Sequence, residues 1–482
     1  YTARTWELAR RPSISPHDGL GANLTAHLVK ERVMRVLPRD NEALNECWLA
    51  DRDRFSYEAL NSDERLTVPM LKQNGQWRET DWQTALEYVA HGLKDIKSEH
   101  GADALGALAT PHSTLEELYL LQKLMRGLGS NNIDHRLRQS DFSADAALAG
   151  APWLGQTVEQ LAQADAVLIV GSTLRKDHPL LAHRLRQAVK HGLKLNLINP
   201  VDDDLLCRVA NKAVVAPSAM VNSLAQVVKA AAQLKQVAAS EILASATPDA
   251  TAQAIAASLV AGKQVAILLG NMAQHHPQAA TLHSLGLELA RVLGANFGFL
   301  GEAANSVGAH IAGAWPKGVG MHAAQMVTSP RQAYVLLNVE PELDCYDAPQ
   351  ALNAMMQAKM VVALSAFKHH AADYADVMLP IAPFTETSGS FVNTEGRVQS
   401  FNAVAKPRGE TRPAWKVLRV LGNLLNLPGF DFNSSEQVRT EVLPNGDTAG
   451  LRDNNLKHAF SAGLGAKADG IEYVAKEQQD AA

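Results

Sequence analysis

The sequence has few cysteines, and they are scattered. Its 482 residues contain three, Cys47, Cys207 and Cys345, and no two of them form a C-x-x-C pair. Zinc knuckles and iron–sulfur clusters take several thiolate ligands from closely spaced cysteines. The spacing therefore excludes both kinds of site as local motifs. We expect three buried, reduced thiols in a reducing compartment.

Long apolar runs and blocks of positive charge are also missing. No stretch reaches the roughly 18 uninterrupted apolar residues of a membrane helix, and residues 1–11 lack the apolar core of a signal peptide. The formal net charge is −5, and Lys and Arg do not cluster. Because phosphate backbones and anionic lipids are recognised by clustered positive charge, we expect no nucleic-acid partner and no direct membrane insertion.

The common catalytic motifs are absent as well. The sequence contains no H-E-x-x-H, no G-x-S-x-G, and no G-x-G-x-x-G after a predicted strand. Two His-His pairs, beginning at His275 and His369, have no carboxylate or third histidine at metal-ligand spacing, so we expect solvated histidines. We therefore assign no catalytic residue and no metal ligand.

What the sequence does contain is a regular alternation of apolar strands and amphipathic helices. Short runs without polar residues are typical of strands buried in a parallel sheet. The predicted strands of this kind are 104–109, 166–170, 193–198, 265–269, 333–337 and 360–364. The predicted helices are 82–96, 118–128, 182–190, 221–234, 250–261, 279–292 and 348–358, the first two with capping boxes at Thr80-x-x-Gln83 and Ser113-x-x-Glu116.

The order of these elements predicts an α/β fold with two doubly wound, mainly parallel sheets behind a small N-terminal β-rich module. In the module, 24–29 and 32–37 are predicted strands. The expected bounds are 1–70 for the module, 71–110 plus 330–430 for a discontinuous first α/β domain, 111–329 for a second, inserted one, and 431–482 for a C-terminal tail. From residue 445 the tail is polar and rich in glycine, so we expect it to be loosely held.

Three loops that follow predicted strands are candidates for a nucleotide cleft. Ligands of doubly wound sheets bind at the carboxyl ends of the strands, where glycine lets backbone N–H groups approach a phosphate and an acidic residue can hold a ribose or a guanine. The candidate residues are Gly171, Ser172, Asn199, Asp202 and Gly270. Ordinary turn formation and helix capping account for the same residues without a ligand, and both interpretations stay open.

Several longer segments resemble one known family. They are Asn45-Glu46-Cys47-Trp48-Leu49-Ala50-Asp51-Arg52-Asp53-Arg54-Phe55 with Tyr57, then 65–70, Gly301-Glu302-Ala303-Ala304-Asn305-Ser306, 374–380, 386–387, Asn393-Thr394-Glu395-Gly396-Arg397-Val398-Gln399, and 413–416. Taken in this order, they resemble the G subunit of bacterial NADH-quinone oxidoreductase, respiratory complex I, in the region of that protein that is similar to molybdopterin oxidoreductases.

The resemblance implies the fold of molybdopterin oxidoreductases such as formate dehydrogenase, with the N-terminal module as a relict of an iron–sulfur domain. It also implies [2Fe-2S] and [4Fe-4S] clusters in an N-terminal region that is absent here. The chain begins at Tyr1, without an initiator methionine, and we expect a longer protein upstream.

At three positions this chain differs from the catalytically active molybdopterin oxidoreductases that the resemblance implies as relatives. Relatives with an extra iron–sulfur cluster have its last cysteine just before Asp-Arg-x-Arg-Phe, where this chain has Ala50. Formate-dehydrogenase-like relatives have a metal-ligating cysteine at the position of Ser140, although serine ligates the metal in some members. Thr173 replaces an asparagine of their nucleotide loop. We therefore expect no cofactor in this chain, neither a cluster nor molybdopterin.

These departures favour a structural and assembly role in a complex that passes electrons from NADH to quinone. The partners would be other peripheral-arm subunits of complex I, and the location the cytoplasmic face of the inner membrane. Two alternatives stay open. One is an active molybdopterin-dependent oxidoreductase domain, and the other is a nucleotide-binding module without redox chemistry, which bound guanine nucleotide would favour.

Overall fold

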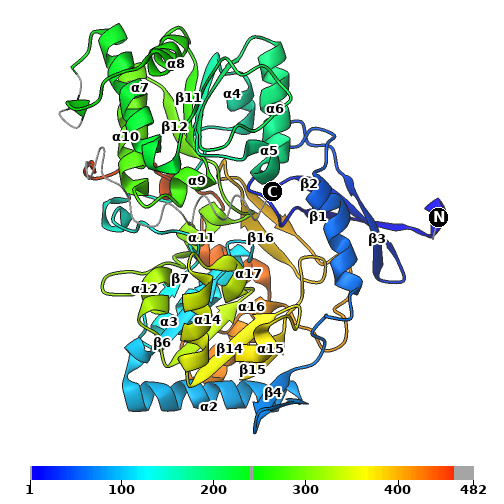
Figure 1. Ribbon diagram of the computed structural model, residues 1–482. Coiled ribbons are helices and arrows are strands. Elements are labelled where there is room, and N and C mark those ends of the chain that lie inside the picture. Colours follow the sequence, from blue (N-terminus) through cyan, green and yellow to red (C-terminus); the bar gives the residue numbers. More distant parts are fainter. Residues whose placement is uncertain (1–2, 239, 241–242, 461–482) are drawn as a thin grey trace.

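The computed structural model describes residues 3–238, 240 and 243–460 and contains two α/β lobes with a small β module at their side (Figure 1). We call the two lobes the five-stranded lobe and the seven-stranded lobe after their sheets, and the β-rich start of the chain the N-terminal module. Both sheets are mainly parallel, so the predicted fold class is confirmed.

The N-terminal module is an antiparallel sheet of three strands followed by a short helix. Its elements are β1 (Ala9–Ile14), β2 (Asn23–Val29), β3 (Arg32–Pro38) and α1 (Asp51–Phe55). The two predicted strands are confirmed as β2 and β3. The pattern missed β1, because Ala9-Arg10-Arg11-Pro12 is exposed and shows no apolar alternation.

The seven-stranded sheet has the order β5-β4-β15-β14-β13-β6-β7 and takes strands from both sides of the five-stranded lobe. Its strands are β4 (Met70–Gln73), β5 (Gln76–Glu79), β6 (Leu105–Ala109), β7 (Ile133–Asp134), β13 (Ala333–Leu337), β14 (Met360–Ser365) and β15 (Val377–Pro380). β13 pairs in parallel with both β6 and β14, at the centre of the sheet.

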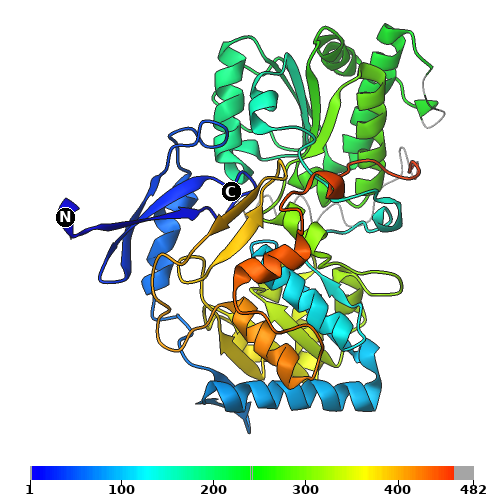
Figure 2. The same ribbon diagram turned by 180° about the vertical axis from the view of Figure 1, so that it is seen from behind.

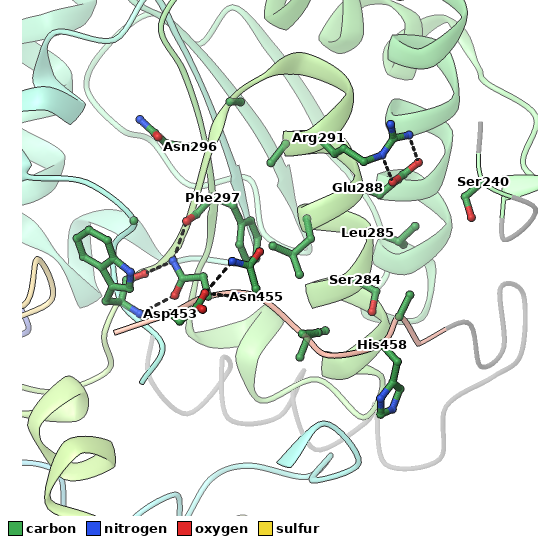
Figure 3. A pocket seen from close by; sticks show the side chains of 18 of the residues that line it. Ser240, Ser284, Leu285, Glu288, Arg291, Asn296, Phe297, Asp453, Asn455 and His458 are labelled. Carbon is green, nitrogen blue, oxygen red and sulfur yellow. Dashed lines mark hydrogen bonds and ion pairs between the residues drawn. The ribbon is translucent and has the colours of Figure 1, made fainter. Parts of the chain in front are cut away.

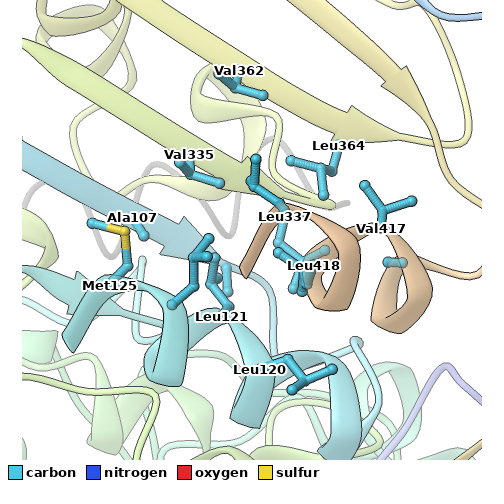
Figure 4. Close-up of a cluster of buried hydrophobic side chains, with 14 of the residues drawn as sticks. Ala107, Leu120, Leu121, Met125, Val335, Leu337, Val362, Leu364, Val417 and Leu418 are labelled. Carbon is cyan, nitrogen blue, oxygen red and sulfur yellow. The ribbon is translucent and has the colours of Figure 1, made fainter. Parts of the chain in front are cut away.

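Two apolar layers cover this sheet. On one face Ala107, Val335 and Val362 pack against helices α2, α3 and α16, as Figure 4 shows for part of the cluster. The other face packs against α12, α14 and α15. The helices of this lobe are α2 (Trp82–His100), α3 (Leu115–Gly127), α11 (Ser306–Ala312), α12 (Ala323–Thr328), α13 (Pro341–Asp344), α14 (Ala348–Gln357), α15 (Ala371–Tyr374), α16 (Ala414–Leu424) and α17 (Ser435–Val442).

The boundary that the sequence suggested at residue 110 lies elsewhere. Both α3 and β7 fall in the range 111–329 that was expected to form the second domain, yet α3 packs on β6 and β7 extends the seven-stranded sheet. β7 has only two residues and gives no apolar run, so the sequence carries no signal for it.

The five-stranded sheet has the order β10-β9-β8-β11-β12, all parallel. Its strands are β8 (Ala166–Val170), β9 (Lys194–Asn199), β10 (Asn211–Val214), β11 (Val265–Leu269) and β12 (Asn296–Phe299). Helices α4 (Val158–Ala162), α5 (Leu174–Asp177) and α6 (Pro179–Lys190) cover one face, and α7 (Met220–Lys235), α8 (Ala250–Val260), α9 (Asn271–Gln274) and α10 (Ala279–Leu293) the other.

A hairpin of β16 (Gly389–Val392) and β17 (Val398–Phe401) lies where the module and the two lobes meet (Figure 2). In the turn between its strands, Thr394 N donates to Gly19 O of the module at 2.6 Å, and Leu154 N donates to Thr394 O at 2.8 Å. Val392 N donates to the side chain of Asn305, at the start of α11, at 2.8 Å. The hairpin therefore connects all three parts.

Residues 443–460 are held more firmly than their composition suggested. The side chain of Asn454 accepts a hydrogen bond from Trp153 N at 2.9 Å and donates to Phe297 O at 2.7 Å. Its carbonyl lies 2.6 Å from Nε2 of the buried His283. The expectation of a loosely held tail is therefore wrong up to residue 460, because one asparagine amide satisfies the edge of β12. Residues 461–482 lie outside the described part.

Both helices are capped one residue later than predicted, and only α3 has a capping box. Helix α2 is capped by Asp81, whose side chain accepts from Thr84 N at 2.9 Å, and α3 is capped by Thr114, which forms a complete capping box with Glu117. In each pair of neighbouring residues both can cap a helix, so only the position of the first helical turn decides which one does.

We predict that Thr114→Ala is less stable than Thr114→Ser by about 1 kcal/mol. Both variants lose the buried methyl group, but serine keeps the hydroxyl that accepts the hydrogen bond from Glu117 N. Urea unfolding followed by circular dichroism measures the difference. Equal unfolding midpoints for the two variants would show that the cap does not stabilise α3.

Candidate functional site

Four of the five candidate residues for a nucleotide cleft come together at the carboxyl end of the five-stranded sheet. Gly171 and Ser172 follow β8, Asn199 ends β9 and Gly270 follows β11. The side chain of Asn199 accepts from Ser172 N at 2.9 Å and donates to Ser172 O at 2.8 Å. It therefore joins the first two loops to each other.

The backbone N–H groups of these loops have acceptors within the protein. Gly171 N donates to Ile198 O at 2.9 Å and Gly270 N to Val170 O at 2.8 Å. Thr173 N and Oγ1 both donate to the carboxylate of Asp177, at 3.2 and 2.6 Å. A nucleotide phosphate binds to free N–H groups of such a loop. Here a carboxylate of the chain itself occupies that role.

The two glycines permit a close approach of two loops. A Cβ atom on Gly270 would lie 2.3 Å from Gly171 O and 2.4 Å from Ser172 Cβ. Gly171 has φ +65°, a conformation that favours glycine. The packing of the loops alone therefore accounts for both glycines.

Asp202, the fifth candidate, lies at the surface. Its two carboxylate oxygens are 2.6 and 2.7 Å from Nζ of Lys212 on β10, and both side chains are about half exposed. The sequence could not show this pairing, because β10 is a short, partly exposed strand without an apolar run.

Ser140, the position of the metal-ligating cysteine in relatives, also has a partner in the chain. Its hydroxyl donates to His275 O at 2.6 Å. His275 itself is only 14% exposed and lies 3.5 Å from Oε2 of Glu302, and His276 is fully buried with Nε2 3.1 Å from Pro217 O. The expectation of solvated histidines is wrong for this pair, because both rings have partners from other loops.

His369 and His370 differ from each other. Nε2 of His369 lies 3.2 Å from Oε1 of Glu340, and that ring is about one third exposed. His370 is exposed at the surface, as expected for a solvated histidine.

The three cysteines are free thiols that lie in different surroundings. The expectation of buried thiols is confirmed for Cys345, whereas Cys207 is half-buried and Cys47 is exposed. Cys47 belongs to the loop before α1, at the outside of the N-terminal module, so the apolar layers do not cover it.

A polar cavity of about 190 Å³ lies where the carboxyl ends of both sheets meet the N-terminal module. Its lining residues come from loops after β6, β7, β8, β11, β12 and β13 and from the module. They are His17, Arg52, Thr110, Pro111, His112, His135, Leu137, Arg138, Asp177, Asn271, Glu302 and Asp344. By its place in the fold this cavity is the candidate functional site.

Ion pairs within the chain balance the charges of the polar cavity. Nε of Arg138 lies 3.7 Å from Glu302, and Nη2 of Arg138 lies 4.0 Å from Asp344. Burial alone would raise the pKa of Glu302, but the neighbouring His275 and Arg138 outweigh it and lower that pKa to about 2. The carboxylate of Glu302 is therefore ionised and paired, and it is no candidate for a general base near neutral pH.

The sequence alone did not point to the polar cavity. Its charged side chains come from five separate segments, and none of these segments contains a catalytic motif. They are Arg52, Arg138, Asp177, Glu302 and Asp344. Glu302 stands in a segment that supported the resemblance, but nothing there marked it as a site residue. The predicted topology could have indicated the site, because every contributing segment either follows a parallel strand or belongs to the N-terminal module.

A larger pocket of about 680 Å³ lies at the outer side of α10, beside the start of β12 and residues 452–459 (Figure 3). Two of its charged residues, Glu288 and Arg291, pair with each other at 2.8 Å. Asn454 lines the same pocket and is bonded to Trp153 and Phe297. We assign no function to this pocket, because these polar groups already have partners.

We predict that Gly270→Ala destabilises the five-stranded lobe by about 1–3 kcal/mol, because the new Cβ has no room against Gly171 and Ser172. The matched control is Gly450→Ala, where the added Cβ meets nothing within 4 Å, and we expect a change of at most about 0.5 kcal/mol there. Thermal unfolding measures both. Equal melting temperatures for the two variants would contradict the close packing of the loops.

Comparison with protein families and known proteins agrees with this geometry. The family model described as "Molybdopterin oxidoreductase" matches residues 65–424, which contain both sheets. A second model, "NADH-ubiquinone oxidoreductase NDSU1/NuoG-like, 4Fe-4S domain", matches residues 8–58, which contain the N-terminal module.

Among related proteins, the mitochondrial "NADH-ubiquinone oxidoreductase 78 kDa subunit" of Candida albicans is 27% identical over 460 residues, and the G subunit of the NADH-quinone oxidoreductase of Rickettsia felis is 28% identical over 451. These alignments cover 92% and 91% of this chain but 56% and 59% of the relatives. The chain thus spans somewhat more than half of their length.

A solved structure, the acetylene hydratase from Pelobacter acetylenicus, has the same fold at 15% identity, with a TM-score of 0.70 over 92% of this chain and 71% of that one. The matched fold, the family model over most of the chain and the resemblance of its segments to the G subunit agree with one another. The chain belongs to the molybdopterin oxidoreductase family.

Proposed function

We propose that this chain is the structural and assembly region of a G-type subunit of NADH-quinone oxidoreductase and that it holds no redox centre of its own. Relatives that match most of its length include subunits of such complexes, which supports the first part. The observation that carries the second part is the pairing of the loops after β8, β9 and β11 with groups of the chain itself.

A pterin dinucleotide does not fit these loops. It needs N–H donors for its phosphates, and the N–H groups of Gly171, Ser172, Thr173 and Gly270 already donate to acceptors of the chain. A metal above Ser140 would take the serine oxygen without its proton, but that hydroxyl keeps its proton in a hydrogen bond to His275 O. Replacing both sets of bonds would require the loops to separate.

An iron–sulfur cluster does not fit the N-terminal module either, although residues 8–58 match a 4Fe-4S domain model. A [4Fe-4S] cluster takes four thiolates as a rule, and the matched range contains one cysteine, the exposed Cys47. Ala50 is buried in an apolar cluster with Leu20 and Leu44. Within the described residues, no three His, Cys, Asp or Glu side chains are placed to hold a metal ion.

The proposed partners are other peripheral-arm subunits of complex I, and the proposed place is the cytoplasmic face of the inner membrane. Among the described helices, none is both long and apolar enough to cross a bilayer. In the assembled complex, electrons from NADH would reach quinone through clusters in other parts of the whole protein and its partners. An active molybdopterin-dependent enzyme and a free nucleotide-binding module remain the alternatives.

We predict that the purified chain contains neither molybdenum, tungsten nor iron at a stoichiometric level. The groups that would hold a pterin and its metal have partners within the chain, and the N-terminal module has one cysteine where a [4Fe-4S] cluster takes four. Elemental analysis by mass spectrometry measures the metals, and fluorescence of the oxidised extract measures pterin. The chain is produced in a host supplied with molybdate and iron. A catalytic molybdopterin enzyme made in the same host is the positive control.

Each alternative predicts a different result. One molybdenum atom per chain with extractable pterin would establish the enzyme and overturn the structural role. Bound guanine nucleotide without metal would establish the nucleotide-binding module. Visible absorption with four iron atoms per chain would show that the N-terminal module holds a cluster in spite of its single cysteine.

A further inference from the structure

Two buried carboxylates lie inside the N-terminal module without a full set of partners. Asp18 and Asp53 are each 1% exposed. Oδ1 of Asp18 accepts from Leu20 N at 3.0 Å, and Oδ1 of Asp53 accepts from the hydroxyl of Ser15 at 2.6 Å. The Oδ2 atoms of both have no hydrogen-bond partner within the described residues. A buried ionised carboxylate needs several donors or a cation, so this arrangement is costly if both groups are charged.

A third unpaired atom lies beside them. Nε2 of His178, at the junction of α5 and α6, is buried and has no partner within the described residues. His178 and Asp18 line the same small cavity of about 10 Å³, together with Leu20, Leu181 and Thr394. Such a cavity has room for about one water molecule. Asp18 of the module thus shares a cavity with a histidine of the five-stranded lobe.

The surrounding groups do not neutralise the pair by contact. Arg52, on the same helix as Asp53, is exposed and donates to Lys176 O, and His112, after β6, is exposed; both act on Asp18 only at longer range. His17 is 4.0 Å from Asp53 Oδ1, and its Nε2 lies 2.7 Å from the hydroxyl of Ser56. Asp177, the residue before His178, adds a further negative charge.

The histidines provide no compensating charge near neutral pH. Burial lowers the pKa of His17 to about 3, and burial also lowers the pKa of His178. Burial, and next to it the charge of Asp18, raise the pKa of Asp53 to about 8. Burial raises the pKa of Asp18 as well. Since two buried carboxylates that repel each other do not both ionise in such a place, one of them keeps its proton.

We propose that Asp18, Asp53 and His178 form a buried proton-binding site that holds the N-terminal module against the five-stranded lobe. The pair keeps one proton, with Asp53 as its main carrier, and this proton removes the repulsion of two negative charges at the place where Asp18 and His178 line one cavity. Its two aspartates lie in the segment that matches a 4Fe-4S domain model, and the ligand that they bind is a proton.

The pH dependence of stability follows from this assignment. An aspartate of the unfolded chain has a pKa of 3.8, whereas the folded value for Asp53 is about 8. Its contribution to stability is therefore complete below about pH 4 and is lost as the pH rises to about 8, where the folded protein also releases the proton. Between these values, the bound proton makes the unfolding equilibrium constant rise by up to about tenfold for each unit of increasing pH.

The test compares the full chain with Asp53→Asn in urea unfolding at a series of pH values across this window. We expect the free energy of unfolding of the variant to depend less on pH, because the contribution of one bound proton is missing. The matched control, Asp63→Asn, removes an exposed carboxylate further along the chain and should keep the profile of the unmodified chain. Identical profiles for Asp53→Asn and the unmodified chain would overturn the proposal.

A second measurement detects the proton itself. In infrared difference spectra near neutral pH, the unmodified chain minus Asp53→Asn should show the carbonyl stretch of a protonated carboxylic acid. The subtraction is needed because burial raises the pKa of Glu116 to about 7, so Glu116 contributes a band of its own. A difference spectrum with only ionised carboxylate bands would also overturn the proposal.

The variant Asp18→Asn keeps the test decisive if Asp53→Asn does not fold. Removing the charge of Asp18 should lower the pKa of Asp53, so the upper end of the pH window moves to lower pH in both unfolding and infrared titrations. A purely structural role for Asp18 would change the stability without moving this midpoint, and that result counts against the proposal.

Discussion

The turn of the β16–β17 hairpin is the constraint on which the arrangement of the molecule depends. Thr394 alone bonds to Gly19 of the module and to Leu154 and Phe299 of the five-stranded side. Its neighbour Asn393 donates to Leu20 O at 2.8 Å, and Glu395 accepts from Val158 N at 2.8 Å. Each of these groups is buried, so losing one partner would leave a desolvated polar atom. Asn393, Thr394 and Glu395, which stand in a segment that supported the resemblance to the G subunit, thus have a structural role at this junction.

The need to give each buried polar group a partner also governs the loops at the carboxyl end of the five-stranded sheet. A doubly wound sheet leaves N–H groups and helix starts free at its carboxyl end, and in many proteins a ligand satisfies them. In this chain Asp177 and Asn199 satisfy them instead. The same backbone arrangement can therefore bind a ligand or form a rigid internal junction. In this chain the side chains of Asp177 and Asn199 favour the junction. This pairing is the physical basis of the proposed structural role.

The sequence was informative wherever burial alone determines the structure. The bounds of β8, β11 and β13 agree with the predicted strands, because each is a continuous apolar run buried on both faces. β10 and β12 were missed, because Asn211-Lys212 and Asn296 make them polar and their pairing is imposed by neighbouring strands. The site was harder to predict. Local sequence gives the residue types after each strand, but only the folded chain shows that Asp202 turns away to Lys212 and that Arg138 meets Glu302.

The split seven-stranded sheet has a consequence for the order of synthesis. β6 leaves the ribosome long before β13, its partner at the centre of the sheet, and until then one edge of β6 is unpaired. The five-stranded lobe lies wholly between them and can form first. Because its first and last strands, β8 and β12, flank the same strand β11, its folding brings the two halves of the outer sheet near each other. The folded five-stranded lobe thereby shortens the effective loop between β6 and β13, which must close before these strands can pair. We expect the nascent chain to complete the seven-stranded sheet last.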